Sequence, residues 1–472
     1  MSAAPVFFRP GDGWVGDVIP FQHDGVFHLW FLYDDRAVPK NGMPWHLVTT
    51  SDFVHFTHHG EAVPSGGPDA EDFNVYTGSV VVAPDGTAHL FSTAQNPDRH
   101  GPDGRPLQLV AHATSDDGLT AWTKHPDLTF GAPDGYEPGD WRDPFVFHDG
   151  GAWRMLVAAR HADGPERRRG TIAQLTSTDL ATWTPTAPFW DPRRYITHEC
   201  PDVFRWGDWW YLVYSEFSDA FCTRYRVARS VDGPWLVPDH DTVDGRAFYA
   251  AKTAERDGRR FFFGWIATRE GDTDDGPWQW AGTMSVLEAD QHADGSLTFR
   301  LPDEVVASFT ESVDAGLPAG PVQLDALDRF AQVVGDTDLP DAFLLSAEID
   351  IEPGTEEVGL LLRATADGDE AGVIRLEPRR NRVVFDRWPR TITGGEQWQI
   401  SGDVPFALER PCDLGPGIHR LEVLVEGDIL VAVIDRRVSL STRLYRRAGE
   451  RIGFFANGGR AALASIDLNR RL

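Results

Sequence analysis

The sequence predicts an all-β protein, in which a five-bladed β-propeller is followed by a C-terminal β-sandwich. A hairpin signal and a polar turn signal alternate through roughly the first 300 residues, which is typical of sheet units repeated around an axis. After about residue 341 the chain continues as alternating apolar strands with tight turns, which is typical of a sandwich. No long amphipathic helix is visible in the first of these two parts.

The hairpin signal is an Asp-Gly or Gly-Asp pair followed by an aromatic and apolar run. It occurs five times at a spacing of roughly 50 to 65 residues, in segments that start at His23, Pro84, His148, Trp206 and Arg256. An Asp-Gly pair between apolar runs favours a type I′ turn, because both central residues of that turn need positive φ. Five such hairpins predict five sheet units.

The second signal is a Ser or Thr with Asp, followed by Trp or Phe, and it completes each repeat. It begins at Thr50, Thr114, Ser177 and Ser230. The first strand of a propeller blade lies against the central axis, so we expect the residues just before each hairpin on innermost strands. In blades two and five these are residues 76–79 (Y-T-G-S) and 248–250 (F-Y-A).

Three acidic residues lie on the other expected inner strands, each among aromatic and branched apolar neighbours. They are Asp17 in W-V-G-D-V-I-P-F, Asp143 in W-R-D-P-F-V-F and Glu199 in H-E-C-P-D-V-F, in blades one, three and four. A carboxylate in such surroundings costs free energy to bury unless it is paired or used. Three of them at equivalent positions predict a shared pocket for a neutral, hydroxyl-rich substrate, where paired carboxylates perform glycoside chemistry.

The three acids have different neighbours, which favours different roles. Asp17 is short and lies in a turn of mixed polarity, which suits a nucleophile that must stay ionised. Glu199 has a longer reach and precedes an apolar stretch, which suits a proton donor of raised pKa. Asp143 follows Arg142, whose charge favours the ionised form, so we expect it to hold sugar hydroxyls and favour a cationic transition state.

Composition limits the class of partner. The chain has 472 residues, with 72 acidic against 44 basic side chains and a formal net charge of -28. So acidic a surface repels phosphate backbones and anionic lipids, so neither nucleic acid nor a membrane is an expected partner. The length fits two domains, which we place at residues 1–310 for the propeller and 311–472 for a linker and the sandwich.

The cysteine count and the first residues favour a cytoplasmic protein. The segment M-S-A-A-P-V-F-F-R-P-G-D lacks the basic and apolar regions of a signal peptide, and no run of about 18 apolar residues occurs. The cysteines, Cys200, Cys222 and Cys412, are too few for a disulfide framework. Secretion with a leader already removed stays open, and so does the oligomeric state.

Other motifs have simpler explanations. A G-x-G-x-x-G match that ends at Gly16 runs into a strand, whereas a dinucleotide motif opens a helix. His198 has no second histidine at ligand spacing, so we expect neither a metal nor a cofactor. Cys200 directly follows Glu199 and is expected to be a small buried packing residue.

With W-x-x-D near the start, R-D-P in the middle and E-C-P-D-V-F later, the chain resembles glycoside hydrolase family 32, which contains invertases, inulinases, levanases and fructan transferases. The resemblance includes F-Y-A at Phe248, W-A-G-T-M-S from Trp280 and the trailing sandwich, so it covers nearly the whole chain. The family fold is a five-bladed propeller with an appended sandwich, in agreement with the count of repeats.

The resemblance implies roles for individual residues. Asp17 aligns with the family nucleophile, Glu199 with its acid/base, and Asp143 with its transition-state stabiliser, which binds two hydroxyls of the fructosyl ring. The implied substrate-binding residues are Trp14, Ser79, Trp141, Arg142, Tyr249 and Trp280. The two tryptophans that precede the acids would line the fructosyl subsite, since apolar sugar faces stack on aromatic rings.

The implied activity is hydrolysis of β-fructofuranosides, such as sucrose, fructo-oligosaccharides, inulin or levan. It would proceed with retention through a covalent fructosyl-enzyme intermediate. The sequence departs from the family pattern W-M-N-D-P-N-G, since Gly16 replaces the asparagine before the acid. In blade two W-S-G-S is Y-T-G-S, and P-R-E-L becomes V-L-E-A around Val286. These changes remove polar side chains from the pocket and affect the substrate more than the reaction class.

Three alternative functions stay open. A fructosyltransferase uses the same residues and differs only in whether water or a sugar attacks the intermediate. An inverting arabinanase- or xylosidase-like furanosidase would hold its acid and base roughly 6.5 to 9.5 Å apart, instead of about 5 to 5.5 Å. A non-catalytic carbohydrate-binding protein could have the same fold, because a fold does not fix a function. The sequence leaves linkage and exo or endo action undetermined.

Overall fold

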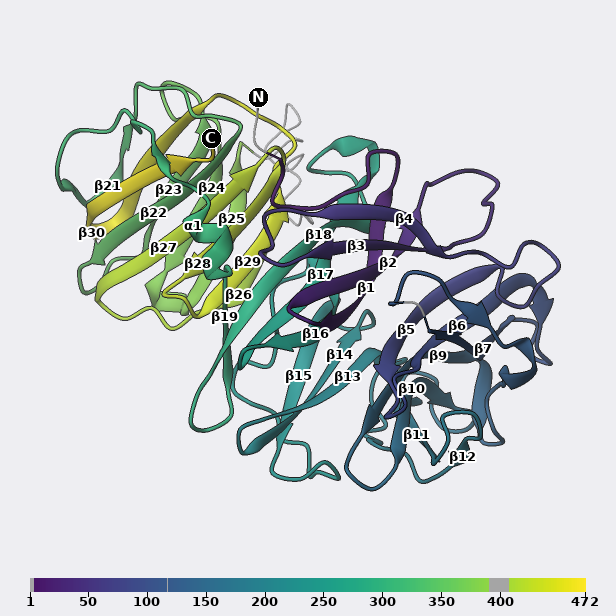
Figure 1. The fold of residues 1–472 in the computed structure, drawn as a ribbon. Helices are drawn as coiled ribbons and strands as arrows, with labels where there is room; N and C mark the ends of the chain where they lie inside the picture. The colour runs from purple at the N-terminus through teal and green to yellow at the C-terminus, as the bar shows by residue number, and fades with distance from the viewer. Residues whose placement is uncertain (1–3, 117, 390–406) are drawn as a thin grey trace.

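The computed structural model describes residues 4–116, 118–389 and 407–472. Figure 1 shows two β-rich lobes, one formed by the first part of the chain and the other by the last. The helices among these residues are short, namely α1 (Asp303–Ala307) and the 3-10 turns η1 (Pro126–Leu128), η2 (Glu270–Asp272) and η3 (Pro378–Arg380). Within the described ranges, no helix has the length and apolar character needed to cross a bilayer.

The first lobe is a five-bladed β-propeller, which confirms the fold class that the hairpin spacing predicts. Each blade consists of antiparallel strands that follow one another along the chain. The strands are, in blade 1, β1 (Trp14–His23), β2 (Val26–Asp34), β3 (Trp45–Thr50) and β4 (Thr57–Val63); in blade 2, β5 (Asn74–Val82), β6 (Ala88–His100), β7 (Pro106–Ser115) and β8 (Thr123–Lys124); in blade 3, β9 (Tyr136–His148), β10 (Trp153–His161), β11 (Gly170–Ser177) and β12 (Thr184–Pro185); in blade 4, β13 (Glu199–Trp206), β14 (Trp209–Glu216) and β15 (Cys222–Ala228); and in blade 5, β16 (Phe248–Arg256), β17 (Arg259–Arg269), β18 (Trp278–Gln291) and β19 (Leu297–Arg300).

Two of the four Asp-Gly hairpins have the type I′ conformation that their sequence predicts, whereas at Asp85-Gly86 and Asp149-Gly150 only the glycine has positive φ. At Asp24 and Gly25 the φ angles are 50° and 81°, and at Asp257 and Gly258 they are 56° and 76°. Positive φ at both central positions is the mark of a type I′ turn, whose twist matches that of the flanking strands. These turns set the register of β1 against β2 and of β16 against β17.

The inner strands β1, β5, β9, β13 and β16 surround a common axis. Each contacts the next in turn, and β16 contacts β1. A backbone pair between Val15 of β1 and Gly282 of β18 also joins blades 1 and 5 into one eight-stranded sheet. The ring is therefore closed by a strand from near the amino terminus and a strand of the last blade.

Every inner strand contains a β-bulge, where two of its residues oppose one on the neighbouring strand or an extra residue is inserted. The bulges include Asp17, Thr77, Asp143, Cys200 and Ala250. Asp143, Cys200 and Ala250 adopt left-handed φ angles of 59°, 51° and 55°. A bulge breaks the alternation of side chains along a strand and re-aims them. Three of these bulge residues, Asp17, Thr77 and Asp143, line a cavity at the axis.

Apolar clusters fill the spaces between neighbouring blades. Trp30 and Trp45 of blade 1 pack with Val75 and Leu90 of blade 2, and all four side chains are buried. Burial stabilises by about 25 cal/mol for each Å² of apolar surface removed from water. Large aromatic side chains therefore hold the blades together where backbone pairing between sheets is sparse.

The second lobe is a β-sandwich whose strands belong to one eleven-stranded sheet system. Its strands are β20 (Glu311–Ser312), β21 (Val322–Val334), β22 (Ala342–Ile351), β23 (Glu357–Ala364), β24 (Ala371–Glu377), β25 (Arg382–Trp388), β26 (Leu408–Pro411), β27 (Gly417–Glu426), β28 (Ile429–Ile434), β29 (Val438–Arg443) and β30 (Arg451–Arg470). The long strand β30 pairs with β23 through its first half and with β22 through its second half, so it connects the two layers. The division at residue 310 falls between β19 and β20 and stays a prediction.

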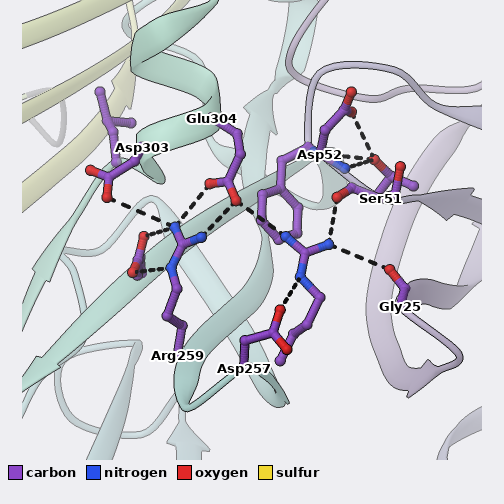
Figure 2. Close-up of polar contacts among 12 residues, drawn as sticks. Gly25, Ser51, Asp52, Asp257, Arg259, Asp303 and Glu304 are labelled. Atoms are coloured by element: carbon purple, nitrogen blue, oxygen red, sulfur yellow. Dashed lines mark hydrogen bonds and ion pairs between the residues drawn. The ribbon is translucent and has the colours of Figure 1, made fainter.

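A charged cluster connects α1 with the closure of the ring (Figure 2). Glu304 of α1 accepts hydrogen bonds from Arg259 at 2.6 and 2.9 Å and from Arg256 at 3.1 Å. Arg256 also donates to the carbonyl oxygens of Ser51 at 2.5 Å and Gly25 at 3.5 Å, both in blade 1. The helix after the last blade thus links blade 5 to blade 1.

Two buried arginines fix the sandwich against the propeller. Arg443 of β29 donates to the carbonyl oxygens of Ile266 at 3.0 Å and Ala267 at 2.8 Å in β17. Arg410 of β26 donates to the carbonyl of Thr242 at 2.7 Å. A buried guanidinium is costly without hydrogen bonds, so these contacts specify how the lobes pack.

Candidate active site

A cavity of about 1000 Å³ lies at the propeller axis, and all five blades contribute to its lining. Asp17 of β1, Asp143 of β9 and Glu199 of β13 line it together. Thr77 of β5 and Trp280 of β18 complete the ring of blades. The fold therefore brings the three acids of the sequence analysis to one hollow, from three different blades.

Asp17 accepts hydrogen bonds on both carboxylate oxygens. Thr77 Oγ1 donates to Oδ2 at 2.5 Å, and Trp265 Nε1 donates to Oδ1 at 2.9 Å. The thiol of Cys200 lies 3.7 Å from Oδ2. Burial raises the pKa of Asp17, and the hydrogen bonds from Thr77 and Trp265 act against that rise. Neutral donors therefore support the anionic form of this carboxyl group.

Glu199 is held by one neutral and one charged donor. Tyr249 donates its phenol proton to Oε2 at 2.6 Å, and the guanidinium of Arg142 donates to Oε1 at 3.0 Å. Arg142 is in turn held by Asp140 at 2.6 Å and by Gln108 at 3.3 Å. Burial raises the pKa of Glu199, while the charge of Arg142 opposes that rise. A group under such opposed influences suits proton exchange.

Asp143 sits at the bulge of β9 in the left-handed region, with φ of 59°. Its backbone N–H donates to Oγ1 of Thr93 at 2.7 Å, and its Oδ2 accepts the backbone N–H of Cys200 at 2.9 Å. Burial raises its pKa, and the charge of Arg142 opposes this rise. The charge of Arg142 favours the ionised form of Asp143, as its place in the sequence predicts, and its guanidinium also donates a hydrogen bond to Glu199.

The remaining substrate-binding candidates lie at different depths. Trp280 lines the cavity and is 38% exposed, whereas Trp141 is fully buried in the core between blades 2 and 3. Adjacent strand residues point to opposite faces, so Arg142 reaches the cavity and Trp141 the core. Trp14 is half-buried, and its ring packs against the guanidinium groups of Arg9 and Arg36, each 4.3 Å away.

Ser79 and Tyr249 lie behind the cavity lining. The hydroxyl of Ser79 donates to the carbonyl of Pro144 at 3.0 Å and accepts the N–H of Val146 at 2.9 Å, so it joins blades 2 and 3. Tyr249 is almost completely buried and acts on the cavity through its hydrogen bond to Glu199.

The structure adds residues that the sequence analysis did not select for the site. Thr77 and Trp265 bond Asp17, and Lys252 lies buried near the acids. Thr77 was identified only as part of the blade-two stretch, and Trp265 lies in F-F-F-G-W, which looks like an ordinary core strand. No pattern in one sequence shows that strands of blades 2 and 5 face Asp17.

Cys200 and His198 are both buried among packed side chains. Cys200 is buried, as expected of a packing residue, and burial raises its thiol pKa well above the usual range. Its nucleophilic form is therefore disfavoured. His198 is packed against the rings of Trp190, Tyr195 and Tyr214, and burial lowers its pKa to about 3. In the part of the chain that the structure describes, no group of three or more metal-ligating side chains is placed to hold an ion.

An aromatic ring fills the space that a side chain at Gly16, next to Asp17, would occupy. A Cβ atom at this position would lie 2.4 Å from Cη2 of Trp280 and 3.0 Å from Cβ of Leu32. The indole of Trp280 also stands edge-on to Trp265 at 6.1 Å. Trp280 of blade 5 thus occupies the space beside Asp17 that a side chain at position 16 would fill.

Among curated proteins the chain has distant relatives that include an invertase and a sucrose-6-phosphate hydrolase. The chain is 27% identical to raffinose invertase of Escherichia coli over 358 residues, covering 70% of each chain. It is 27% identical to sucrose-6-phosphate hydrolase of Vibrio alginolyticus over 282 residues, which covers 56% of this chain and 55% of that protein.

Solved structures share the fold over almost the whole chain. Fructan 1-exohydrolase IIa from Cichorium intybus superposes with a TM-score of 0.76 at 17% identity, covering 98% of this chain and 96% of that one. Exo-inulinase from Aspergillus awamori gives a TM-score of 0.75 at 19% identity, covering 99% and 97%. At such identities the likeness establishes the fold alone.

The family model decides the classification. The model described as the Glycosyl hydrolases family 32 N-terminal domain matches residues 7–297, which contain the strands β1 to β18 and the three acids of the cavity. On this match, the chain belongs to glycoside hydrolase family 32.

Proposed function

We propose that the protein hydrolyses β-fructofuranosides with retention of configuration, by two successive displacements at the anomeric carbon. The observation that carries this proposal is the cavity lined by Asp17, Asp143 and Glu199, in which each carboxyl group has a different set of partners. Three carboxyl groups with separate environments can divide the tasks of nucleophile, stabiliser and acid/base.

In the first displacement, a carboxylate oxygen of Asp17 attacks the anomeric carbon and the bond to the leaving-group oxygen breaks. Glu199 transfers its proton to that oxygen, which leaves as an alcohol. The hydrogen bonds from Thr77 and Trp265 favour the Asp17 anion before attack. Burial raises the pKa of Glu199, which favours a proton on this group at the start.

In the second displacement, water attacks the anomeric carbon of the ester and gives its proton to Glu199, while the bond to Asp17 breaks. Fructose leaves and both carboxyl groups return to their starting states. The Cys200 N–H occupies one oxygen of Asp143, which leaves lone pairs of the other for sugar hydroxyls. Its negative charge stabilises the cationic character of both transition states.

The substrate class follows from the relatives' names and stays part of the proposal. Relatives include invertases, sucrose-6-phosphate hydrolases and levanbiose-producing levanases. The chain spans 70% of the raffinose invertase and 55% of the Vibrio alginolyticus enzyme, so the activity of the whole relatives is not carried over unchanged. Sucrose and short fructo-oligosaccharides are the substrates we expect first.

A substrate panel followed by proton NMR tests the function. Sucrose, sucrose 6-phosphate, small fructo-oligosaccharides, inulin, levan and arabinofuranosides are each incubated with the protein. We expect fructose, released first as the β-anomer. Release of the opposite anomer would point to inversion, longer fructosides would point to transfer, and no product from any fructoside would contradict the proposal.

Variants of the acids test the assigned roles. We expect Asp17→Asn and Glu199→Gln each to lower kcat by about 10²- to 10⁴-fold with the fold intact. The activity of Glu199→Gln should be restored when fructosyl fluoride is the substrate, because fluoride leaves without protonation. Asp24→Asn in the exposed hairpin of the same blade is the matched control. Activity within tenfold of wild type for Asp17→Asn or Glu199→Gln on sucrose would rule out the assignment.

We also propose a cytoplasmic location. The three cysteines, Cys200, Cys222 and Cys412, are buried free thiols, which suits a reducing compartment. Fractionation of the native host with an antibody against the protein checks this, and recovery outside the cell would contradict it.

A further inference from the structure

A buried lysine lies at the axis of the propeller and contacts three other blades. Lys252 is on β16 and only 2% exposed. Its Nζ donates to the carbonyl of Gly78 in blade 2 at 2.8 Å and to that of Pro201 in blade 4 at 3.4 Å. The ring of Phe145 in blade 3 has its centroid 5.0 Å from Nζ. One ammonium group therefore links four of the five blades.

The contact with blade 2 acts on the nucleophile. Gly78 directly follows Thr77, whose hydroxyl donates the 2.5 Å hydrogen bond to Asp17. The bulge at Thr77 brings the strand so close to β6 that a Cβ at Gly78 would lie 1.8 Å from a backbone oxygen. By bonding the Gly78 carbonyl, Lys252 holds this bulge and with it the donor to Asp17.

The contact with blade 4 acts on the third acid in the same way. Pro201 directly follows Cys200, whose backbone N–H donates to Oδ2 of Asp143 at 2.9 Å. Cys200 has a left-handed φ of 51°, so its peptide orientation depends on how the bulge is held. Lys252 bonds the carbonyl of Pro201 inside this bulge.

The charge of Lys252 complements the direct partners of the acids. Glu199 has a guanidinium within 3.0 Å, whereas the hydrogen-bond donors to Asp17 and Asp143 are neutral. Burial lowers the pKa of Lys252, and the carboxylates of Asp202, Asp143 and Asp17 oppose this by favouring the ammonium form. The same attraction favours the ionised form of those acids.

We propose that Lys252 is a positioning residue of the active site: its ammonium group holds the bulges of blades 2 and 4 and supplies positive charge that favours the ionised forms of Asp17 and Asp143. It is not part of the cavity lining, so it acts through other residues and does not touch substrate. The inference rests on the proposed function for the roles of the two aspartates.

Other titratable groups also lie near Lys252, Asp17 and Asp143, and the experiment has to separate their effects. The groups around Lys252 or the acids it serves are Asp17 from β1, Arg142 and Asp143 from β9, Glu199, Cys200 and Asp202 from β13, and Arg260 from β17. Arg260 is the matched control, because it is a buried cation that favours ionised Asp202 but stacks on Phe204 with its guanidinium carbon 4.0 Å from that ring.

The test compares Lys252→Met, Lys252→Gln and Lys252→Arg with wild type and Arg260→Met. On a substrate that wild type hydrolyses, we expect Lys252→Met to lose about 100-fold in kcat with KM nearly unchanged. We also expect the acidic limb of its pH–rate profile to move up by about one pH unit. Lys252→Gln, which keeps donors but no charge, should show the same shift. Lys252→Arg should restore the limb, and Arg260→Met should leave it in place.

The inference would be overturned if Lys252→Met had the same kcat and the same acidic limb of the pH–rate profile as wild type. If Lys252→Met does not fold, the same comparison is made with Lys252→Gln. Melting temperature against pH gives a readout that needs no substrate. Loss of the cation raises the folded pKa values of the aspartates, and stability from such groups is lost as pH rises through them.

We therefore expect the deficit in melting temperature of Lys252→Met to grow between about pH 4 and 7, and that of Lys252→Arg to stay constant. A pH-independent deficit in Lys252→Met would contradict the role of charge. Wild type without activity on any fructoside would defeat the proposed function, while these melting curves would still decide the role of Lys252.

Discussion

The hydroxyl of Thr77 lies 2.5 Å from Oδ2 of Asp17 and reaches it from the neighbouring blade. On the other oxygen, Trp265 donates from blade 5 at 2.9 Å. Burial raises the pKa of Asp17, and these two hydrogen bonds are the largest influences that lower it. The ionisation of the proposed nucleophile therefore depends on blades 2 and 5 as much as on its own strand.

Thr77→Val removes this donor and keeps the shape of the side chain. We expect the pKa of Asp17 to rise, so the acidic limb of kcat/KM moves to higher pH and kcat falls by about tenfold near pH 5. Thr77→Ser keeps the hydroxyl and should behave like wild type. An unshifted limb in the valine variant, with melting temperature unchanged, would refute the role of this bond.

Tyr249→Phe should act on the opposite limb. The phenol donates to Glu199 at 2.6 Å and thereby favours the ionised carboxylate, which lowers its pKa. Its loss raises the pKa of Glu199, so the basic limb of kcat/KM should move up by about half a pH unit or more. A pH–rate series over both limbs measures this. Movement of the acidic limb alone would show that Tyr249 serves another acid.

Substitutions at Gly16 and Trp280 should have non-additive effects on kcat/KM. Gly16→Ala places a Cβ where Cη2 of Trp280 lies and should lower kcat/KM by about tenfold by displacing the indole. In the Trp280→Ala background the same change should cost much less, giving a coupling of about 1 kcal/mol.

Gly11→Ala is the control for this cycle, since a Cβ at Gly11 would meet no heavy atom within 4 Å. The cycle is measured with sucrose and with a longer fructoside, so that any change in substrate preference is seen. Strictly additive losses in kcat/KM would show that Trp280 does not occupy the place of a side chain at position 16.

Glu304→Gln tests the cluster of Figure 2 as a device for closing the ring. Burial pushes the pKa of Glu304 up, but the hydrogen bonds and charges of Arg259 and Arg256 outweigh it, so the net pKa is lowered. A lowered pKa stabilises the fold above the unfolded pKa, and this stability is lost as pH falls through the folded pKa.

We expect Glu304→Gln to lower the free energy of unfolding by about 1–2 kcal/mol at pH 7, with the difference shrinking below about pH 4. Denaturant melts at both pH values measure it. Glu311→Gln is the control, since its pair with Arg470 is solvent-exposed and should contribute little. Equal stability of Glu304→Gln and wild type at pH 7 would contradict the role of the cluster.

Much of the fold could be predicted because its signals are local. An Asp-Gly or Gly-Asp pair, such as Asp24-Gly25, needs only the conformational preferences of two residues, and five such pairs at regular spacing predict repeated hairpins. Sequence alternation likewise indicates the sandwich. How β30 serves both of its layers could not be predicted, because a long strand that changes partners looks like any other alternating run.

The site was less accessible from sequence, because bulges change where side chains point. Asp17 and Glu199 stood out as carboxylates in apolar strands, which is a chemical signal. Trp141 and Arg142 are neighbours with the same apparent prospects, and only the observed strand orientation puts one in the core and the other in the cavity. Lys252 looks like a surface residue by composition, and only closure of the ring buries it.

The pairing of Val15 with Gly282 has a consequence for biosynthesis. The strand that carries Asp17 is translated before the other blades, yet its partners Trp265 and Trp280 are translated only with the last blade. Until then the nascent chain holds an incomplete cavity and an unpaired strand edge, which other chains can join. Ring closure therefore completes the candidate active site and, at the same step, pairs the strand edge that would otherwise favour aggregation.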